Sequence, residues 1–350
     1  MKHGGDLLSY KNEYKGDIID FSSNINPLGY PEGLKEEIFE NFKEIDKYPD
    51  IKYRNLKTSV SKYLKCNEEN VVLGNGSMEI IDHSLYFKDR VLLFYPCFGE
   101  YEDRAKVNNK EIIKIPLDKE FKIDLEVFKK NLKDNTIVIL GNPNNPTGLR
   151  IEKETLLSIY KEIKSKNSLL VLDEAFFEFS PEDYDSIELF KNENYENILI
   201  IRAATKVYGI PGLRLGYGCT NENLVQKISE NQLPWSINTL ADLAGRWILS
   251  EEEFLIKSKN YLNKEREFLL KELNSINGIR PFNTHSNFIL IKLDKLNGEY
   301  ILKNLISRGI LIRTCTSFEG LDDSFIRVAI KDRNNNLELI KGLKDIYGEI

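Results

Sequence analysis

The sequence predicts an α/β fold, in which helices enclose a mainly parallel sheet and a smaller α+β region follows. Two features predict it. Apolar runs alternate with amphipathic stretches between residues 71 and 201, which is typical of repeated βα units. A long charged amphipathic stretch, residues 252–276, then leads to three further apolar runs. Because 350 residues suit two domains, we expect a large domain over residues 30–250 and a small domain that combines residues 251–350 with residues 1–29 as an N-terminal arm.

The first 64 residues predict a loop and two helices. Turn-forming residues dominate positions 22–29, so this stretch is expected to be a loop. Residues 31–42 begin with a proline and carry apolar residues on one helical face, which predicts a helix. A second helix is expected over residues 54–64.

Residues 71–81 predict a short strand, a glycine turn and the start of a helix. Free backbone amides at such a helix N-terminus, between Gly76, Ser77 and Met78, could bind a phosphate. A plain strand-to-helix turn has the same pattern, so the phosphate site stays open at this point. No Walker lysine follows the glycines, which argues against a nucleoside triphosphatase.

The remaining elements follow from the same periodicities. Strands are expected at residues 90–95, 136–140, 169–172, 198–201, 213–219, 287–291, 310–313 and 325–330. Helices are expected at residues 98–107, 152–163, 240–249, 252–276 and 337–346.

The composition limits the classes of function. A net charge of −6 gives no basic excess for a nucleic acid, although it leaves room for a small anionic substrate in a local cluster of cations. No apolar run is long enough to cross a membrane, and no signal peptide is visible, so we expect a cytoplasmic protein. The four cysteines are far apart, which suggests neither disulfides nor a metal site.

A lysine and an arginine follow the predicted strand at residues 198–201. Lys206 lies just after its end, where the carboxyl edge of a parallel sheet normally binds its ligand. Gly209, Pro211 and Gly212 then turn the chain, so that Arg214 returns near Lys206. The pair suits a phosphorylated aldehyde cofactor, since the amine condenses with the aldehyde and the guanidinium binds the phosphate. Taken alone, both could also be surface cations.

Two further motifs decide between these interpretations. Residues 141–148 (Gly-Asn-Pro-Asn-Asn-Pro-Thr-Gly) follow one strand, and Asp173-Glu-Ala-Phe176 ends the next. In this order and spacing, with Lys206 and Arg214, they resemble the fold-type I pyridoxal-phosphate enzymes, the aspartate aminotransferase superfamily. The resemblance runs over nearly the whole chain and implies pyridoxal 5′-phosphate as the cofactor.

The resemblance also implies a role for each residue. Lys206 would bind the cofactor aldehyde covalently, and Asp173 would keep the pyridine nitrogen protonated, so that the ring can accept electrons. Asn145 would donate to the ring oxygen. The cofactor phosphate would be bound by Gly76, Ser77, Met78, Thr205 and Arg214. Phe98 would stack on the ring, although ordinary core packing explains it equally well. Tyr48 would reach the neighbouring subunit's cofactor, which implies a homodimer with shared sites.

Two positions depart from the pattern of the superfamily. Phe176 stands where many relatives have a tyrosine, so one hydrogen bond to the ring oxygen is missing. Ala203 stands where a phosphate-binding serine is common, which leaves Thr205 as the hydroxyl donor.

Several other stretches resemble one branch of the superfamily, the L-threonine-O-3-phosphate decarboxylases of cobalamin biosynthesis, which are close to the histidinol-phosphate aminotransferases. These stretches are His3-Gly-Gly, residues 20–29, 210–217 and 233–238, Leu311-Ile-Arg313 and Ile326-Arg-Val-Ala-Ile330. By this resemblance His3, Asn24 and Arg313 would contact the substrate phosphate, and Arg327 its carboxylate, with Asn145 also near the substrate.

The implied reaction is decarboxylation of L-threonine O-3-phosphate to (R)-1-aminopropan-2-yl phosphate. An aminotransferase of the histidinol-phosphate type is the alternative, because the residues alone do not show which bond at Cα is broken. A binding module without turnover is disfavoured by the lysine itself. A dinucleotide-dependent dehydrogenase is disfavoured because no Gly-x-Gly-x-x-Gly follows the first strand.

Overall fold

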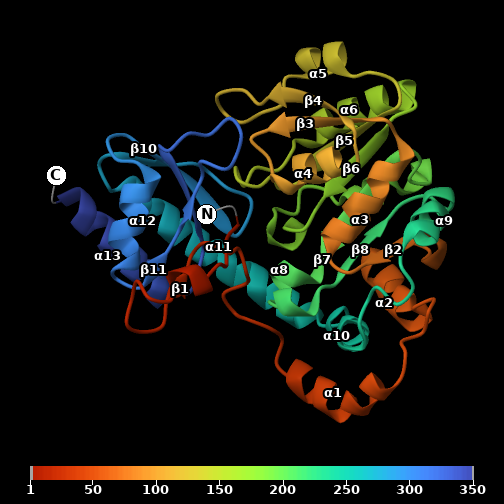
Figure 1. Cartoon of the computed structure of the whole chain (residues 1–350), viewed down its shortest axis with the longest axis horizontal. Helices are drawn as coiled ribbons and strands as arrows, with labels where there is room; N and C mark the ends of the chain where they lie inside the picture. The colour runs from red at the N-terminus through yellow and green to blue at the C-terminus, as the bar shows by residue number, and fades with distance from the viewer. Residues whose placement is uncertain (1–2, 349–350) are drawn as a thin grey trace.

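The computed structural model describes residues 3–348 and is built on two main sheets (Figure 1). The larger one has seven strands in the order β2 (Val71–Gly74), β8 (Gly216–Cys219), β7 (Ile198–Ala203), β6 (Leu169–Asp173), β5 (Thr136–Gly141), β3 (Arg90–Tyr95) and β4 (Glu111–Pro116). Strand β8 is antiparallel to both neighbours, and all other pairs are parallel. The predicted α/β fold with a mainly parallel sheet is confirmed.

Helices cover both faces of this sheet because its strands are apolar on both sides. In β3, Val91 and Leu93 pack into one cluster of buried residues, whereas Leu92 and Phe94 pack into another. The first cluster includes apolar residues of α3 (Ser77–Ser84), α4 (Glu100–Val107) and α9 (Glu222–Asn231). The second includes residues of α2 (Arg54–Leu64), α5 (Leu125–Asn131), α6 (Lys153–Ser165), α7 (Ser186–Phe190) and α10 (Thr239–Ile248).

The smaller sheet has four antiparallel strands from the C-terminal part of the chain. Their order is β12 (Arg313–Thr314), β13 (Phe325–Ala329), β10 (Phe288–Leu293) and β9 (Ile279–Pro281). Helices α12 (Gly298–Ile306) and α13 (Arg333–Gly348) lie beside it, and α11 (Glu252–Asn274) connects it to the rest of the chain (Figure 1). Strand β1 (Ile19–Asp20) pairs in parallel with β11 (Ile310–Leu311), so the N-terminal segment joins this part of the molecule.

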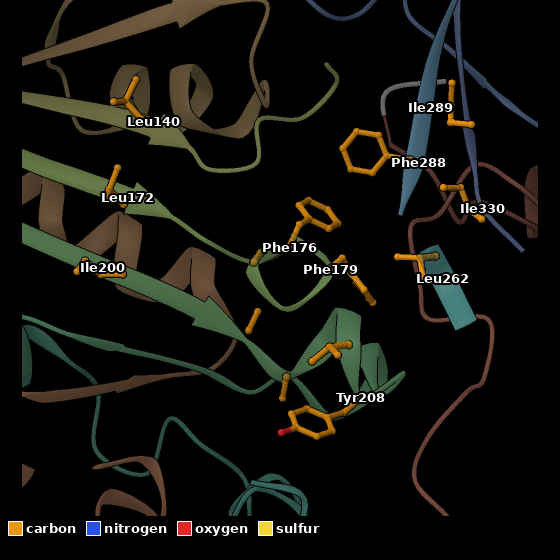
Figure 2. Close-up of a cluster of buried hydrophobic side chains, with 14 of the residues drawn as sticks. Leu140, Leu172, Phe176, Phe179, Ile200, Tyr208, Leu262, Phe288, Ile289 and Ile330 are labelled. Carbon is orange, nitrogen blue, oxygen red and sulfur yellow. The ribbon is translucent and has the colours of Figure 1, made fainter. Parts of the chain in front are cut away.

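One apolar core continues from the large sheet to the small one. Figure 2 shows it passing from Leu172 on β6 through Phe176 and Phe179 to Phe288 on β10. Phe176 and Phe288 meet edge to face, with ring centroids 5.1 Å apart. Leu262 of α11 belongs to the same cluster. The two sheets are therefore held together by packing at the carboxyl ends of the large sheet's strands.

The observed elements differ from the expected ones mainly at turns. The second helix has the predicted bounds, but the first is shorter: α1 covers Leu34–Glu40 and a 3₁₀ helix follows at Phe42–Asp46. The strand expected over residues 213–219 begins only at Gly216, because Pro211–Leu213 form a 3₁₀ turn and Arg214 has a φ of 64°. The sequence did not predict β1, β4, β9, α5, α7, α8, α9 or α12. Between residues 3 and 348, no helix is both long and apolar enough to cross a bilayer.

Candidate active site

A cavity of about 730 Å³ opens at the carboxyl ends of the parallel strands, between the two sheets. Most of the site residues expected from the sequence line it. They are His3, Asn24, Ser77, Met78, Phe98, Asn145, Asp173, Thr205, Lys206, Arg214, Arg313 and Arg327. Gly76 lies directly behind this wall, whereas Tyr48 lies elsewhere on the surface. The fold therefore brings together residues that are up to 324 positions apart in the sequence.

Lys206 lies on α8 (Ala204–Val207), a single turn of helix directly after β7. Within residues 3–348 its ammonium group has no hydrogen-bond or ion-pair partner, and it lies 5.9 Å from the centroid of the Phe176 ring. Burial, reinforced by the positive charges of Arg327 and Arg214, lowers the pKa of Lys206 to about 8. A substantial fraction of the amine is therefore neutral near physiological pH, as a nucleophilic lysine requires.

The loop that precedes α1 holds α8 in place. The Asn26 amide N–H donates to the Lys206 carbonyl at 3.1 Å, and its side chain donates to the Val207 carbonyl at 2.6 Å. Gly209 approaches Gly29 so closely that a Cβ at position 209 would collide with the Gly29 backbone. Residues 20–29 thus hold α8 and its lysine in place, and three of them, Ser22, Ser23 and Asn24, line the cavity.

Asp173 ends β6 and points a buried carboxylate into the same cavity. Its Oδ2 accepts a hydrogen bond from the Tyr101 hydroxyl at 2.7 Å, and its Oδ1 accepts one from the Ala175 amide at 3.0 Å. Burial raises the pKa of Asp173, while the bonds from Tyr101 and Ala175 act in the opposite direction. A carboxylate held in this way is suited to face a cationic ring nitrogen.

Gly76 and Arg214 approach each other at the start of α3. Gly76 has a φ of 82°, and a Cβ at this position would collide with the Arg214 guanidinium. A Cβ at Gly216 would likewise collide with the backbone of Gly76 and Ser77. Only glycines allow the helix N-terminus and the guanidinium to converge here, and both groups bind phosphate well. This arrangement, called the phosphate cradle below, could bind a phosphate group at the wall of the cavity.

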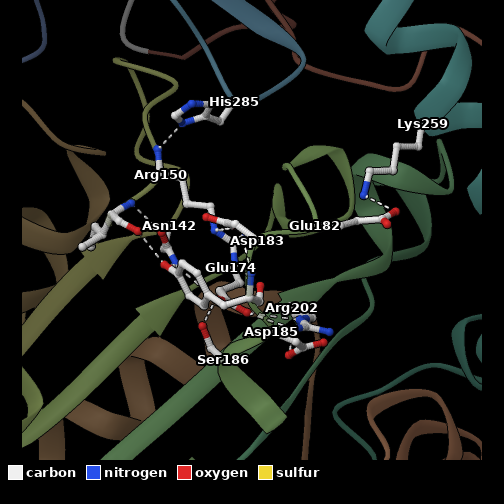
Figure 3. A network of polar contacts seen from close by, with 12 residues as sticks. Asn142, Arg150, Glu174, Glu182, Asp183, Asp185, Ser186, Arg202, Lys259 and His285 are labelled. Atoms are coloured by element: carbon white, nitrogen blue, oxygen red, sulfur yellow. Dashed lines mark hydrogen bonds and ion pairs between the residues drawn. The ribbon is translucent and has the colours of Figure 1, made fainter. Parts of the chain in front are cut away.

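A buried polar network fixes the strand ends beneath the cavity (Figure 3). Glu174, the neighbour of Asp173, accepts two hydrogen bonds of 3.2 Å from the Arg202 guanidinium on β7. It also accepts a bond of 3.1 Å from Asn142, which begins the loop that carries Asn145. The network therefore ties β5, β6 and β7 together just below the three residues that the resemblance assigns to the cofactor ring. Sequence reasoning did not single it out.

Arg313 and Arg327 also line the cavity. They lie directly opposite each other on β12 and β13, and each is less than 5% exposed. Arg327 donates to the Ser22 carbonyl at 2.8 Å and to the Asn145 side chain, and its Nε atom has no partner within residues 3–348. Arg313 donates to the Ser317 hydroxyl. Two buried cations at such close quarters favour a ligand that carries negative charge.

His3 and Asn24 line the same cavity. The Nε2 atom of His3 lies 3.0 Å from the Glu100 carboxylate, and its segment is anchored by a bond of 2.8 Å from the Gly5 amide to the Ser22 hydroxyl. Asn24 is 4% exposed, and its Oδ1 atom has no hydrogen-bond partner within residues 3–348. A buried acceptor without a partner is costly, so it suits a donor on a bound molecule.

Phe98 and Tyr48 have different surroundings. Phe98 lines the cavity and also meets Tyr101 edge to face, with centroids 5.6 Å apart. Tyr48 is 79% exposed, and its ring packs on Trp235, at 4.6 Å between centroids. Helix α1 and the segment that follows it lie at the edge of the molecule, next to α10 (Figure 1). Within one subunit, Tyr48 is therefore not part of the cavity.

Comparison with known proteins agrees with this geometry. Residues 16–343 match the sequence profile described as "Aminotransferase class I and II". The chain belongs to this family. The cofactor of this family is pyridoxal 5′-phosphate, and the cavity fits that molecule: a lysine amine without a hydrogen-bond partner within residues 3–348, a buried carboxylate and the phosphate cradle open onto one space.

Three relatives indicate branches of the family to which the chain is similar. A protein of Caldanaerobacter subterraneus subsp. tengcongensis, provisionally named threonine-phosphate decarboxylase, is 39% identical over 100% of this chain and 97% of its own length. The threonine-phosphate decarboxylase of Salmonella typhimurium is 30% identical over 94% and 91%. The crystal structure of the histidinol-phosphate aminotransferase from Clostridium acetobutylicum is 39% identical, with a TM-score of 0.89 over 94% of this chain and 99% of that one.

Proposed function

We propose that the chain decarboxylates a phosphorylated amino acid, with L-threonine O-3-phosphate as substrate and (R)-1-aminopropan-2-yl phosphate as product. The observation that carries the proposal is the buried pair Arg313 and Arg327, which opens onto the same cavity as Lys206. A substrate with both a phosphate and a carboxylate would use both guanidinium groups at once. Two relatives named as threonine-phosphate decarboxylases support this choice, as does the role in cobalamin biosynthesis that the resemblance implies.

The residues of the chain divide the work as follows. Lys206 and Asp173 would hold the two ends of the reactive ring system, and the cofactor phosphate would be held by Gly76, Ser77, Met78, Thr205 and Arg214. When bound, the cofactor supplies an electron sink for the bond broken at the substrate Cα. Arg327 and Arg313 orient the carboxylate and the phosphate. Lys206, with its lowered pKa, is placed to deliver a proton to Cα after carbon dioxide has left.

An aminotransferase of the histidinol-phosphate type is the second candidate, because a histidinol-phosphate aminotransferase of known structure is also 39% identical. Histidinol phosphate carries one anionic group, so it would use only one of the two arginines at a time. The two functions differ in their products and in their need for a second substrate.

The test is carbon dioxide release from O-phospho-L-threonine by the purified holoenzyme without 2-oxoglutarate. O-phospho-L-serine and L-threonine serve as probes of the methyl and phosphate groups, and histidinol phosphate with 2-oxoglutarate serves as the competing reaction. Release of carbon dioxide without an oxo acid supports the decarboxylase. Turnover only with histidinol phosphate and 2-oxoglutarate would establish the aminotransferase instead.

We further propose a homodimer with shared sites, in which Tyr48 reaches the partner's cavity. Large apolar side chains are exposed around it, including Phe39, Phe42, Ile51 and Leu233, and a subunit interface would cover them. We also propose that the chain divides into a large domain, residues 30–250, and a small domain of residues 1–29 with 251–350.

The cytoplasm is the proposed location, because all four cysteines are free thiols and such thiols persist in a reducing compartment.

A further inference from the structure

Tyr101 makes a contact that neither the motifs nor the resemblance assigned. It lies on α4, is 3% exposed and donates its hydroxyl proton to Asp173 Oδ2 at 2.7 Å. Asp173 lies 72 positions later, at the end of β6. Because the other oxygen of Asp173 accepts from the Ala175 amide at 3.0 Å, the carboxylate is fixed from two directions. The plane of the carboxylate is thereby determined by the protein before any ligand binds.

The chemistry of the bond suits an ionised aspartate. Burial raises the pKa of Tyr101 well above its usual value, and the negative charge of Asp173 raises it further. The phenol therefore keeps its proton and acts as a donor. The same hydrogen bond opposes the effect of burial on the pKa of Asp173. A hydrogen bond to a charged acceptor is stronger than a neutral one, so its loss should be measurable.

The ring of Tyr101 also packs against the residue expected to cover the cofactor. Phe98 stands perpendicular to it, at 90° and 5.6 Å between centroids, and Phe98 in turn meets His3 at 6.3 Å. Phe98, Tyr101 and Asp173 all line the cavity. One tyrosine thus contacts both the aromatic wall and the carboxylate that the bound ring would face.

We propose that Tyr101 is a positioning residue, whose hydroxyl fixes the orientation of the Asp173 carboxylate toward the ring nitrogen of the cofactor. The proposal rests on the cofactor site and is independent of whether the chain decarboxylates or transaminates its substrate. It differs from a packing role, which would require the aromatic ring but not the hydroxyl. Tyr101→Phe separates these two roles, because it removes only the hydroxyl.

The matched control is Tyr160→Phe. Tyr160 is also buried, and its hydroxyl donates to the Glu196 carbonyl at 2.8 Å, outside the cavity. Three quantities are measured for both variants: the dissociation constant of pyridoxal 5′-phosphate from the apoenzyme, the pH at which the absorbance of the bound cofactor changes, and kcat with KM. Urea unfolding of each apoenzyme shows whether the fold is intact.

For Tyr101→Phe we expect about 10-fold weaker cofactor binding, a shifted spectral pH midpoint and a kcat about 10-fold lower with KM little changed. Tyr160→Phe should match the wild type in all three. If Tyr101→Phe also matches the wild type, the proposal is wrong. If both variants change equally, the effect is structural, which overturns it as well.

A double-mutant cycle with Asp173→Asn provides the second measurement. If Tyr101 acts through Asp173, Tyr101→Phe should change cofactor affinity much less in the Asp173→Asn background than in the wild type. If the effects of the two substitutions on the cofactor affinity simply multiply, the two residues act independently, and the proposal is overturned even if kcat falls. If Asp173→Asn alone leaves the cofactor affinity and the spectrum unchanged, Asp173 does not face the cofactor, and the assignment of the cofactor site is wrong. This outcome differs from a failure of the role proposed for Tyr101 alone.

Discussion

Arg313 and Arg327 occupy opposing positions on two antiparallel strands, and both buried side chains line the cavity. Cross-strand neighbours of like charge destabilise a sheet. Burial lowers the pKa of both, to about 10 for Arg327. The arrangement makes sense if the cost is offset by an anionic substrate when it binds.

The first prediction concerns these two arginines. Arg313→Gln and Arg327→Gln should each reduce kcat/KM for O-phospho-L-threonine by about 10- to 100-fold, because each removes a charge-assisted contact. Inorganic phosphate should inhibit the wild type and Arg327→Gln competitively, but inhibit Arg313→Gln much less. Equal loss of phosphate inhibition in both variants would contradict the separate roles given to them.

Cofactor capture by the apoenzyme should depend on pH through Lys206. Only the neutral amine attacks an aldehyde, and its pKa is about 8, so the rate should rise with pH through about 8 and then level off. An ordinary lysine would continue to accelerate toward about pH 10. Stopped-flow absorbance measures the rate, and borohydride reduction should label wild type but not Lys206→Ala. Arg327→Gln removes a nearby positive charge and should move the midpoint upward; an unchanged midpoint would argue against this electrostatic account.

The phosphate cradle predicts an intolerant glycine. Gly76→Ala places a Cβ against the Arg214 guanidinium and requires a φ of 82° that alanine rarely adopts. We expect at least about 10-fold weaker cofactor binding and a loss of about 1 kcal/mol in the free energy of unfolding. Gly212→Ala is the control, since a Cβ there meets no atom within 4 Å. Equal cofactor affinities for the two variants would rule the cradle out.

Glu178 should make the stability of the apoenzyme pH-dependent. Its Oε1 accepts a bond from the Tyr63 hydroxyl at 2.9 Å, its Oε2 is buried without a partner within residues 3–348, and burial raises its pKa to about 7. The folded state therefore binds more protons than the unfolded state between about pH 4.5 and 7, so this contribution is complete below that window and is lost as the pH rises through it. Glu178→Gln should be more stable than wild type at pH 8, by up to about 3 kcal/mol, with a smaller difference at pH 5.

Urea unfolding at the two pH values measures this effect. Glu182→Gln is the control, because Glu182 is exposed and pairs with Lys259 at the surface. A Glu178→Gln variant that is less stable than wild type at both pH values would show that the ionised carboxylate stabilises the fold.

The shared-site dimer can be tested by complementation. Lys206→Ala and Tyr48→Ala subunits should each be nearly inactive alone. In a mixed dimer, one cavity combines an intact Lys206 with an intact Tyr48 from the other chain, so random mixing should restore about a quarter of wild-type activity. The measurement is kcat after refolding the two chains together. No recovery despite mixed dimers would place Tyr48 outside the partner's site.

The residues that line the cavity could be predicted from the sequence better than the residues and strands that hold them in place. Asp173, Lys206 and Asn145 follow predicted strands, and parallel strands bring such positions to one edge of a sheet. Strand β4 was missed because its residues Glu111–Pro116 mix charged and apolar side chains, as an edge strand can.

Tyr101 and the bond from Arg202 to Glu174 were missed for another reason. Their partners are distant in sequence, and a helical tyrosine or a strand arginine gives no sign of which carboxylate it will meet. The position of Tyr101, one helical turn after Phe98, was the only local hint.

The pairing of β2 with β8 sets the order in which the cradle can be assembled. Gly74 lies opposite Gly216, so a growing polypeptide on the ribosome displays Gly76 long before Arg214 and its strand have been synthesised. The binding site for the cofactor phosphate is therefore complete only after β8, the last strand of the seven-stranded sheet, has been synthesised. Incorporation of the coenzyme would accordingly report that β8 has been inserted between β2 and β7.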